Sequence, residues 1–99
     1  MTELVRDRWP VLAAQIDAAL RSADEPVLAH AWHDAHFVQE CRCGDDFCQS
    51  FYTEPPPEGA YGPGHRNVVL DAPWPGDLIL DVVGEQIMYV EVLYRATLD

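Results

Sequence analysis

The three cysteines of the chain are the residues whose type and spacing most directly predict chemistry. They all lie in the stretch Cys41-Arg42-Cys43-Gly44-Asp45-Asp46-Phe47-Cys48. The Gly-Asp-Asp segment at its centre is typical of a turn, so we expect a β-hairpin. Because thiolates are preferred zinc ligands, a hairpin that gathers three sulfurs is a candidate metal site.

The length of the turn decides whether the sulfurs gather. A four-residue loop over residues 44–47 sets Cys43 opposite Cys48 and Cys41 opposite Ser50, which puts all three sulfurs on one face. A three-residue loop over residues 44–46 pairs Cys48 with Arg42 instead and turns the Cys48 sulfur to the other face. The sequence leaves both registers open.

A structural zinc site made of Cys41, Cys43 and Cys48 requires a fourth ligand. His65 is the first candidate for it, and His36 is the alternative. The spacing Cys-x-Cys-x4-Cys differs from the usual Cys-x-x-Cys pairs. The competing interpretation is that the thiols pack as small hydrophobic groups and that no cofactor is present.

A reactive cysteine would require a nearby cation and a base, whereas the acidic residues Glu40, Asp45 and Asp46 oppose a lowered thiol pKa. No other catalytic motif occurs in the sequence, so we expect a non-catalytic protein, with thiol chemistry as the remaining exception. We also expect Asp81 and Glu91 to lie on opposite faces of a hairpin, which excludes them as an acid–base pair.

Histidines and a long loop provide two further groups of candidates. His30, His33 and His36 are three residues apart, and we interpret them as the solvent-facing side of an amphipathic helix rather than a metal site. The loop at 54–66 is either a recognition edge, with Tyr61, His65 and Arg66, or a proline-stiffened connection whose tyrosine packs over the sheet.

The periodicity of the apolar residues predicts the elements that position these groups. A main helix should run from Pro10 to about Arg21 and a second from Pro26 to about Asp34. Strand-like patterns cover residues 37–43, 47–53, 67–71, 77–83 and 86–94. We therefore predict a single α+β domain over residues 1–99, with two N-terminal helices packed on an antiparallel sheet of about five strands.

The final hairpin has a defined register in this prediction. A type II′ turn at Gly84-Glu85 pairs Val82 with Ile87, Leu80 with Tyr89 and Ile79 with Val90. Both faces of the hairpin are then largely apolar. The face away from the helices would need cover from the long loop or from a second copy, so we expect a homodimer.

The net charge of the chain restricts the kinds of molecule that it can bind. Six basic and seventeen acidic residues give a net charge of −11, which disfavours nucleic acid and anionic membrane surfaces and favours a basic protein partner. The chain lacks a long apolar run and a signal-peptide pattern, and its three cysteines are too few for a disulfide scaffold. We therefore expect a cytoplasmic protein.

Several short segments of the sequence resemble segments of a known group of proteins. They are the cysteine stretch, Phe51-Tyr52-Thr53, the prolines at 55–57, the segment 62–67 and Leu80-Asp81-Val82-Val83. In these strings residues 36–94 resemble small actinobacterial proteins that carry a Cys-x-Cys-Gly segment before a strand. The resemblance implies a bacterial cytoplasmic protein and brings no activity with it.

Overall fold

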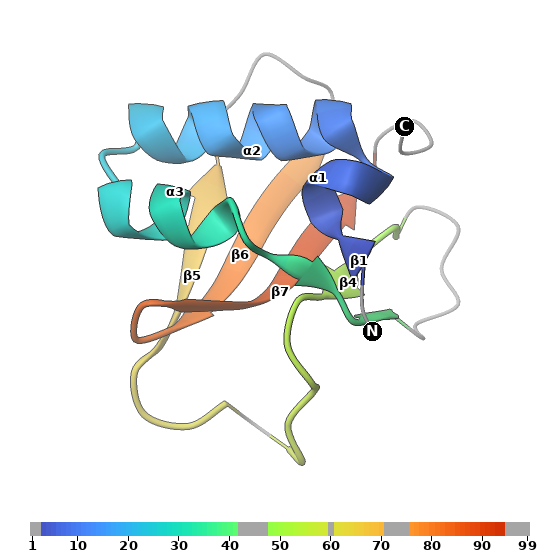
Figure 1. Cartoon of the computed structure of the whole chain (residues 1–99). Coiled ribbons are helices and arrows are strands. Elements are labelled where there is room, and N and C mark those ends of the chain that lie inside the picture. The colour runs from blue at the N-terminus through green and yellow to red at the C-terminus, as the bar shows by residue number, and fades with distance from the viewer. Residues whose placement is uncertain (1–2, 42–47, 60, 71–75, 95–99) are drawn as a thin grey trace.

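Figure 1 shows the structure of the protein, a computed structural model that describes residues 3–41, 48–59, 61–70 and 76–94. Within these ranges the helices are α1 (Val5–Arg8), α2 (Pro10–Ser22) and α3 (Pro26–Trp32). The strands are β1 (Glu3–Leu4), β2 (His36–Phe37), β3 (Gln39–Glu40), β4 (Phe51–Tyr52), β5 (His65–Leu70), β6 (Asp77–Val83) and β7 (Gln86–Leu93). The predicted α+β class, with N-terminal helices on a five-stranded antiparallel sheet, is confirmed.

Helix α2 forms where the apolar period of the sequence is most regular. Pro10 stands in its first turn, where a residue without an N–H costs no hydrogen bond. Leu12, Ile16 and Leu20 then recur every four residues, and each is 0% exposed. These three side chains form the stripe that fixes α2 on the sheet.

Helix α3 packs beside α2 through both apolar and polar contacts. Leu28 and Ala29 are buried, and the indole Nε1 of Trp32 donates a hydrogen bond of 3.0 Å to the carbonyl of Ala13 in α2. The helix begins at Pro26 as predicted and ends at Trp32, before the expected end near residue 34.

The five-stranded sheet has the order β3-β4-β7-β6-β5, and all neighbouring strands are antiparallel. Helices α2 and α3 lie across one face of it, which we call the inner face (Figure 1). The other face, which we call the outer face, carries the candidate site. Strands β1 and β2 form a separate two-stranded sheet that the sequence did not predict.

The inner face is apolar because every second side chain of a strand points to the same side. Its side chains are buried and join those of the helices in one core. The sheet contributes Phe51, Val68, Leu70, Leu78, Leu80, Val82, Ile87, Val90 and Val92 to this core.

A β-bulge divides the β6–β7 hairpin into two registers. Val82 pairs with Ile87, as predicted from the turn. The register then shifts between Asp81 and Val82, so that Asp81 pairs with Tyr89 and Met88 is the extra residue. One extra residue moves all following side chains of β7 to the opposite face.

The predicted pairs beyond the bulge are therefore wrong. Leu80 pairs with Val90 instead of Tyr89, and Ile79 pairs with Glu91. Tyr89 and Glu91 consequently lie on the outer face, so this part of the predicted second apolar face is polar. The predicted homodimer was motivated by that apolar face, and the state of association itself stays a prediction.

The remaining strand boundaries differ in length from the sequence prediction. Strands β3 and β4 are two residues long, and they occupy parts of the predicted segments 37–43 and 47–53. Strand β5 begins two residues earlier than predicted, β6 has the predicted bounds, and β7 ends one residue earlier. Among the described helices, none is both long and apolar enough to cross a membrane.

Candidate functional site

The outer face of the sheet carries most of the side chains that could bind or react. They include acidic, aromatic, imidazole and thiol groups from all five strands or their direct continuations. These residues are Cys41, Cys48, Ser50, Tyr52, His65, Asn67, Asp81, Tyr89 and Glu91.

A continuous row of paired residues crosses the outer face at the level of the bulge. In strand order it runs Gln39, Tyr52, Tyr89, Asp81 and Asn67, each paired with the next. The rings of Tyr52 and Tyr89 lie 4.4 Å apart between their centroids. The row therefore places an aromatic pair directly beside a carboxylate.

Asp81 is the most buried charged residue of the outer face, with 8% of its surface exposed. Its Oδ1 lies 2.8 Å from His65 Nε2 and accepts a hydrogen bond of 2.7 Å from Asn67 Nδ2. Both contacts come from β5 and converge on Oδ1. Among the described residues, no donor reaches the other carboxylate oxygen, Oδ2.

Glu91 is the second carboxylate of this region. It is the diagonal neighbour of Asp81 across β6 and β7, where side chains stand roughly 7 Å apart. Burial raises the pKa of Glu91, and the charge of Asp81 raises it further. Within the described part of the chain, no hydrogen bond stabilises its charged form. The two carboxylates thus repel each other in partly desolvated surroundings.

Tyr61 lies in the long loop and packs against β5, near enough to the two carboxylates to feel their charge. Its ring lies 4.9 Å from that of His65, a contact that fits a loop packing its tyrosine against the sheet, and the alternative of a recognition edge stays a prediction. Burial raises the pKa of Tyr61 to about 12, and the negative charges of Asp81 and Glu91 add to the effect. We call Tyr52, Tyr61, Asp81 and Glu91 the acid–tyrosine cluster.

The thiols form a second polar group next to this cluster. The Sγ of Cys48 donates to the Oγ of Ser50 at 3.2 Å, and the backbone N–H of Val92 donates to the same oxygen at 2.9 Å. The Tyr89 hydroxyl hydrogen-bonds with Cys41 and Ser50. Burial and, next, the Cys41 contact raise the pKa of Tyr89. Tyr89 therefore connects the thiols to the row that contains Asp81.

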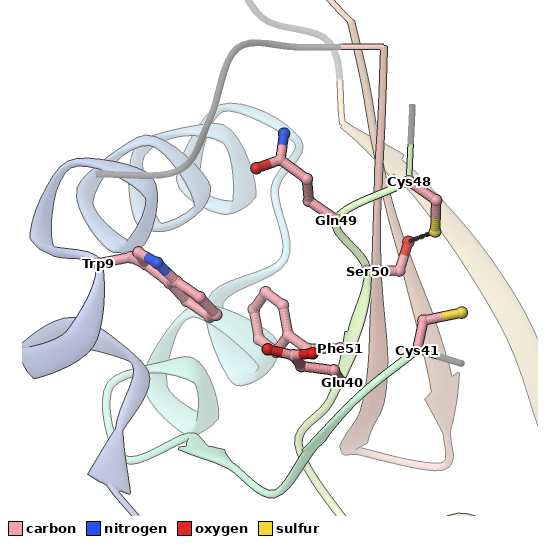
Figure 2. A pocket seen from close by; sticks show the side chains of 7 residues that line it. All are labelled: Trp9, Glu40, Cys41, Cys48, Gln49, Ser50 and Phe51. Carbon is pink, nitrogen blue, oxygen red and sulfur yellow. Dashed lines mark hydrogen bonds between the residues drawn. The ribbon is translucent and has the colours of Figure 1, made fainter. Parts of the chain in front are cut away.

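The described part of the cysteine hairpin follows the register of the four-residue loop. The N–H of Cys41 donates to the carbonyl of Ser50 at 2.9 Å, which continues the pairing of β3 with β4. Cys41 and Cys48 direct their sulfurs to the same side, as Figure 2 shows. Cys43, the remaining predicted thiolate ligand, lies outside the described residues.

The predicted fourth ligands lie elsewhere. His65 belongs to β5, and β4, β7 and β6 separate it from β3 beside Cys41. Four strand spacings of about 4.8 Å put the two strands about 19 Å apart, so the structure does not bring His65 to the thiols. His36 pairs with Leu4 in the small sheet and is exposed. Among the described residues, no group of three or more histidine, cysteine or acidic side chains is arranged to hold a metal ion.

A cavity of about 290 Å³ lies beside the thiols, lined by Trp9, Glu40, Cys41, Cys48, Gln49, Ser50 and Phe51. Its aromatic wall is formed by Trp9 and Phe51, whose rings are 4.8 Å apart. The sulfurs point away from these rings (Figure 2). The cavity therefore separates an aromatic side from a thiol side and does not gather both around one ligand.

The three spaced histidines do not share one helix face. His33 follows the end of α3 and its ring nitrogens lie 2.9 Å from the Arg6 guanidinium. His30 is exposed near the helix end, and His36 is a strand residue. The interpretation of solvent-facing residues fits their exposure.

Sequence reasoning missed the acid–tyrosine cluster because it excluded Asp81 and Glu91 as neighbours. That exclusion is corrected by the bulge, which brings both to the outer face. A signal was present in the sequence: two acidic residues interrupted otherwise apolar strands, at positions where a continuous register would have left each one among apolar side chains.

Comparisons of the chain with protein-family models, with curated proteins and with solved structures found no match.

Proposed function

We propose that this chain is a small acidic cytoplasmic protein that works by binding, without catalysis, and that the acid–tyrosine cluster binds a basic segment of a partner protein. The observation that carries the proposal is the pair Asp81 and Glu91. Two partly buried carboxylates stand close together, and each has oxygen atoms that no described donor reaches. A bound cation would satisfy both groups at once.

The surroundings of the two carboxylates favour an organic cation over a metal ion. Tyr52 and Tyr61 border the pair, and tyrosine rings attract ammonium and guanidinium groups through their π faces. A guanidinium group presents several N–H donors in a plane and can bridge two carboxylates. An arginine-rich or lysine-rich segment is therefore the ligand whose chemistry fits the cluster.

The charge of the whole chain supports the same partner. A net charge of −11 attracts a basic surface over long range and accelerates its association. The same field repels phosphate backbones, so the proposal includes no nucleic acid.

Binding of a fluorescent peptide of about ten residues that alternates arginine and valine tests the proposal by fluorescence anisotropy. We expect the double variant Asp81→Asn/Glu91→Gln to weaken binding at least about tenfold, equivalent to about 1.4 kcal/mol. The amide at position 81 keeps an oxygen for His65 and Asn67, which limits the structural disturbance.

The double variant Asp7→Asn/Asp34→Asn is the matched control. It changes the net charge by the same amount, but its residues are exposed and lie in or next to the helices. We expect it to weaken binding far less. Equal losses in both variants, or no binding by the wild type, would refute a specific cationic site on the outer face.

A zinc-stabilised module is the second candidate function. The observation that favours it is the common direction of the Cys41 and Cys48 sulfurs. Its ligands would be Cys41, Cys43, Cys48 and a donor other than His65. Elemental analysis of protein purified without a metal-affinity tag tests this candidate, and one zinc per chain whose removal unfolds the protein would support it.

A further inference from the structure

Strand β5 forms one edge of the five-stranded sheet and is its longest exposed edge. It pairs over six residues with β6 on one side. In the part of the chain that the structure describes, no strand pairs with its other side. The opposite edge, β3, is only two residues long. The His65 N–H donates to the carbonyl of Gly62 at 3.4 Å, and the rest of a strand edge of this length presents backbone N–H and C=O groups to which another strand can bind.

Two of the usual protections of an edge strand, proline and a bulge, are missing from β5. Natural sheets block their edges with prolines, bulges or exposed charges. Strand β5 contains no proline, and its register with β6 is continuous from His65 to Leu70. Its apolar residue Val69 is 64% exposed. The edge is therefore suited to accept another strand.

Both basic side chains of β5 are occupied within the chain. Arg66 donates to the carboxylate of Glu25 with bonds of 2.9 and 3.3 Å, on the helix side of the sheet. The His65 ring contacts Asp81 on the outer face. Arg66 is 47% exposed, and the carboxylate of Glu25 beside it offsets the repulsion that its charge would exert on a basic chain.

We propose that the partner's basic segment binds in extended form along the free edge of β5, as a sixth strand of the sheet. This inference rests on the proposed function, because it specifies how the segment reaches Asp81, which lies on the strand next to β5. An added strand would lie two spacings, about 10 Å, from β6 with Asp81, and three spacings, about 14 Å, from β7 with Glu91. Every second side chain would extend over Asn67 toward Asp81, a distance that a long arginine or lysine side chain helps to span.

The net charge of the chain decides whether a basic segment or a second copy of the chain binds at the β5 edge. Pairing of two β5 edges would bring together two chains that each carry a net charge of −11. Such like-charged association is opposed over long range, whereas a basic segment neutralises the field. The backbone edge supplies the hydrogen bonds in either case, so the charge favours the basic segment.

Two N-methylated versions of the arginine–valine peptide test the proposal. Each carries N-methyl groups at one of the two alternating sets of positions, so that one edge of the peptide strand loses its N–H donors and the other keeps them. A peptide that pairs with β5 uses one edge only. We expect one version to bind about tenfold or more weakly than the parent peptide and the other to bind nearly as well.

Amide hydrogen exchange of the wild-type protein gives the second readout. We expect the parent peptide to slow exchange at those β5 amides that do not pair with β6, and to leave α2 unchanged. Equal binding of all three peptides, without added protection in β5, would overturn the strand addition. If that binding still depended on Asp81 and Glu91, the proposed function would stand.

Two other outcomes also overturn the inference. Protection of β5 that rises with protein concentration in the absence of peptide, together with a dimer in sedimentation, would identify a second copy as the occupant. A complete lack of binding by the parent peptide would remove both the strand addition and the proposed function.

Discussion

On the inner face of the sheet, the alternate side chains of β6 and β7 are apolar and buried against α2 and α3. On the outer face, the side chains between them include Asp81, Tyr89 and Glu91. The inner face follows from the hydrophobic effect alone, since any residue of similar size and polarity would serve. The outer face combines burial with charge, an arrangement that costs stability and is typical of a functional surface.

The largest expected effect comes from the inner face. Leu80 is 0% exposed, so the substitution Leu80→Ala should leave a cavity and lower the free energy of unfolding by about 2–5 kcal/mol. Urea denaturation followed by tryptophan fluorescence measures this loss. The substitution Val69→Ala, on the outer face of β5, is the control and should cost less than about 0.5 kcal/mol. Similar losses at both positions would contradict the division between the faces.

A smaller loss of stability is expected when a hydroxyl group of the outer face is removed. The substitution Tyr89→Phe keeps the ring beside Tyr52 and removes the hydroxyl that contacts Cys41 and Ser50. The free energy of unfolding should fall by about 0.5–1.5 kcal/mol. Labelling of Cys41 and Cys48 with a thiol reagent should also accelerate, because their hydrogen-bond network loses a member. An unchanged stability and labelling rate would show that the network contributes nothing.

The smallest effect is a pH dependence that arises from Glu91. Its pKa is raised in the folded state, so the folded protein binds the proton more tightly than the unfolded chain does. Glu91 therefore contributes to the free energy of unfolding below its ordinary pKa of about 4.5. This contribution is lost as the pH rises through the higher pKa of the folded state. The variant Glu91→Gln should therefore be at least as stable as the wild type at pH 7.

Thermal unfolding of both proteins across this pH range measures the effect. The difference between Glu91→Gln and the wild type should narrow as the pH falls from 7 toward 4.5. The variant Leu80→Ala removes no titrating group, so its difference from the wild type should stay nearly constant. If the wild type instead became more stable relative to Glu91→Gln as the pH rises, the raised pKa of Glu91 would be contradicted.

The parts of the fold that depend on local periodicity could be predicted from the sequence. The apolar spacing of α2, its initial Pro10 and the alternation of β6 each act within a few residues, and these elements have the predicted start or bounds. The register beyond the β6–β7 turn could not be predicted in the same way. It depends on Met88 as a single extra residue, and the preference for a bulge there arises from the packing of both faces together.

The candidate site was less predictable than the fold because it depends on strand order. The sequence places His65 only seventeen residues after Cys48, yet the two strands β7 and β6 lie between their positions in the sheet. Strand order is fixed by which apolar faces pack together, and no local sequence pattern predicts it. The hairpin that joins Cys41 and Ser50 was predictable because it connects neighbours in the chain, whereas its register was one of two that the sequence left open.

The most direct test of the central claim is a nuclear magnetic resonance titration of the ¹⁵N-labelled protein with the arginine–valine peptide. Binding at the outer face predicts that the largest amide shift changes occur at Asn67, Asp81, Tyr89 and Glu91, while α2 and α3 change little. Largest changes in α2 and α3, with β5, β6 and β7 unaffected, would contradict the claim that the outer face is the functional surface.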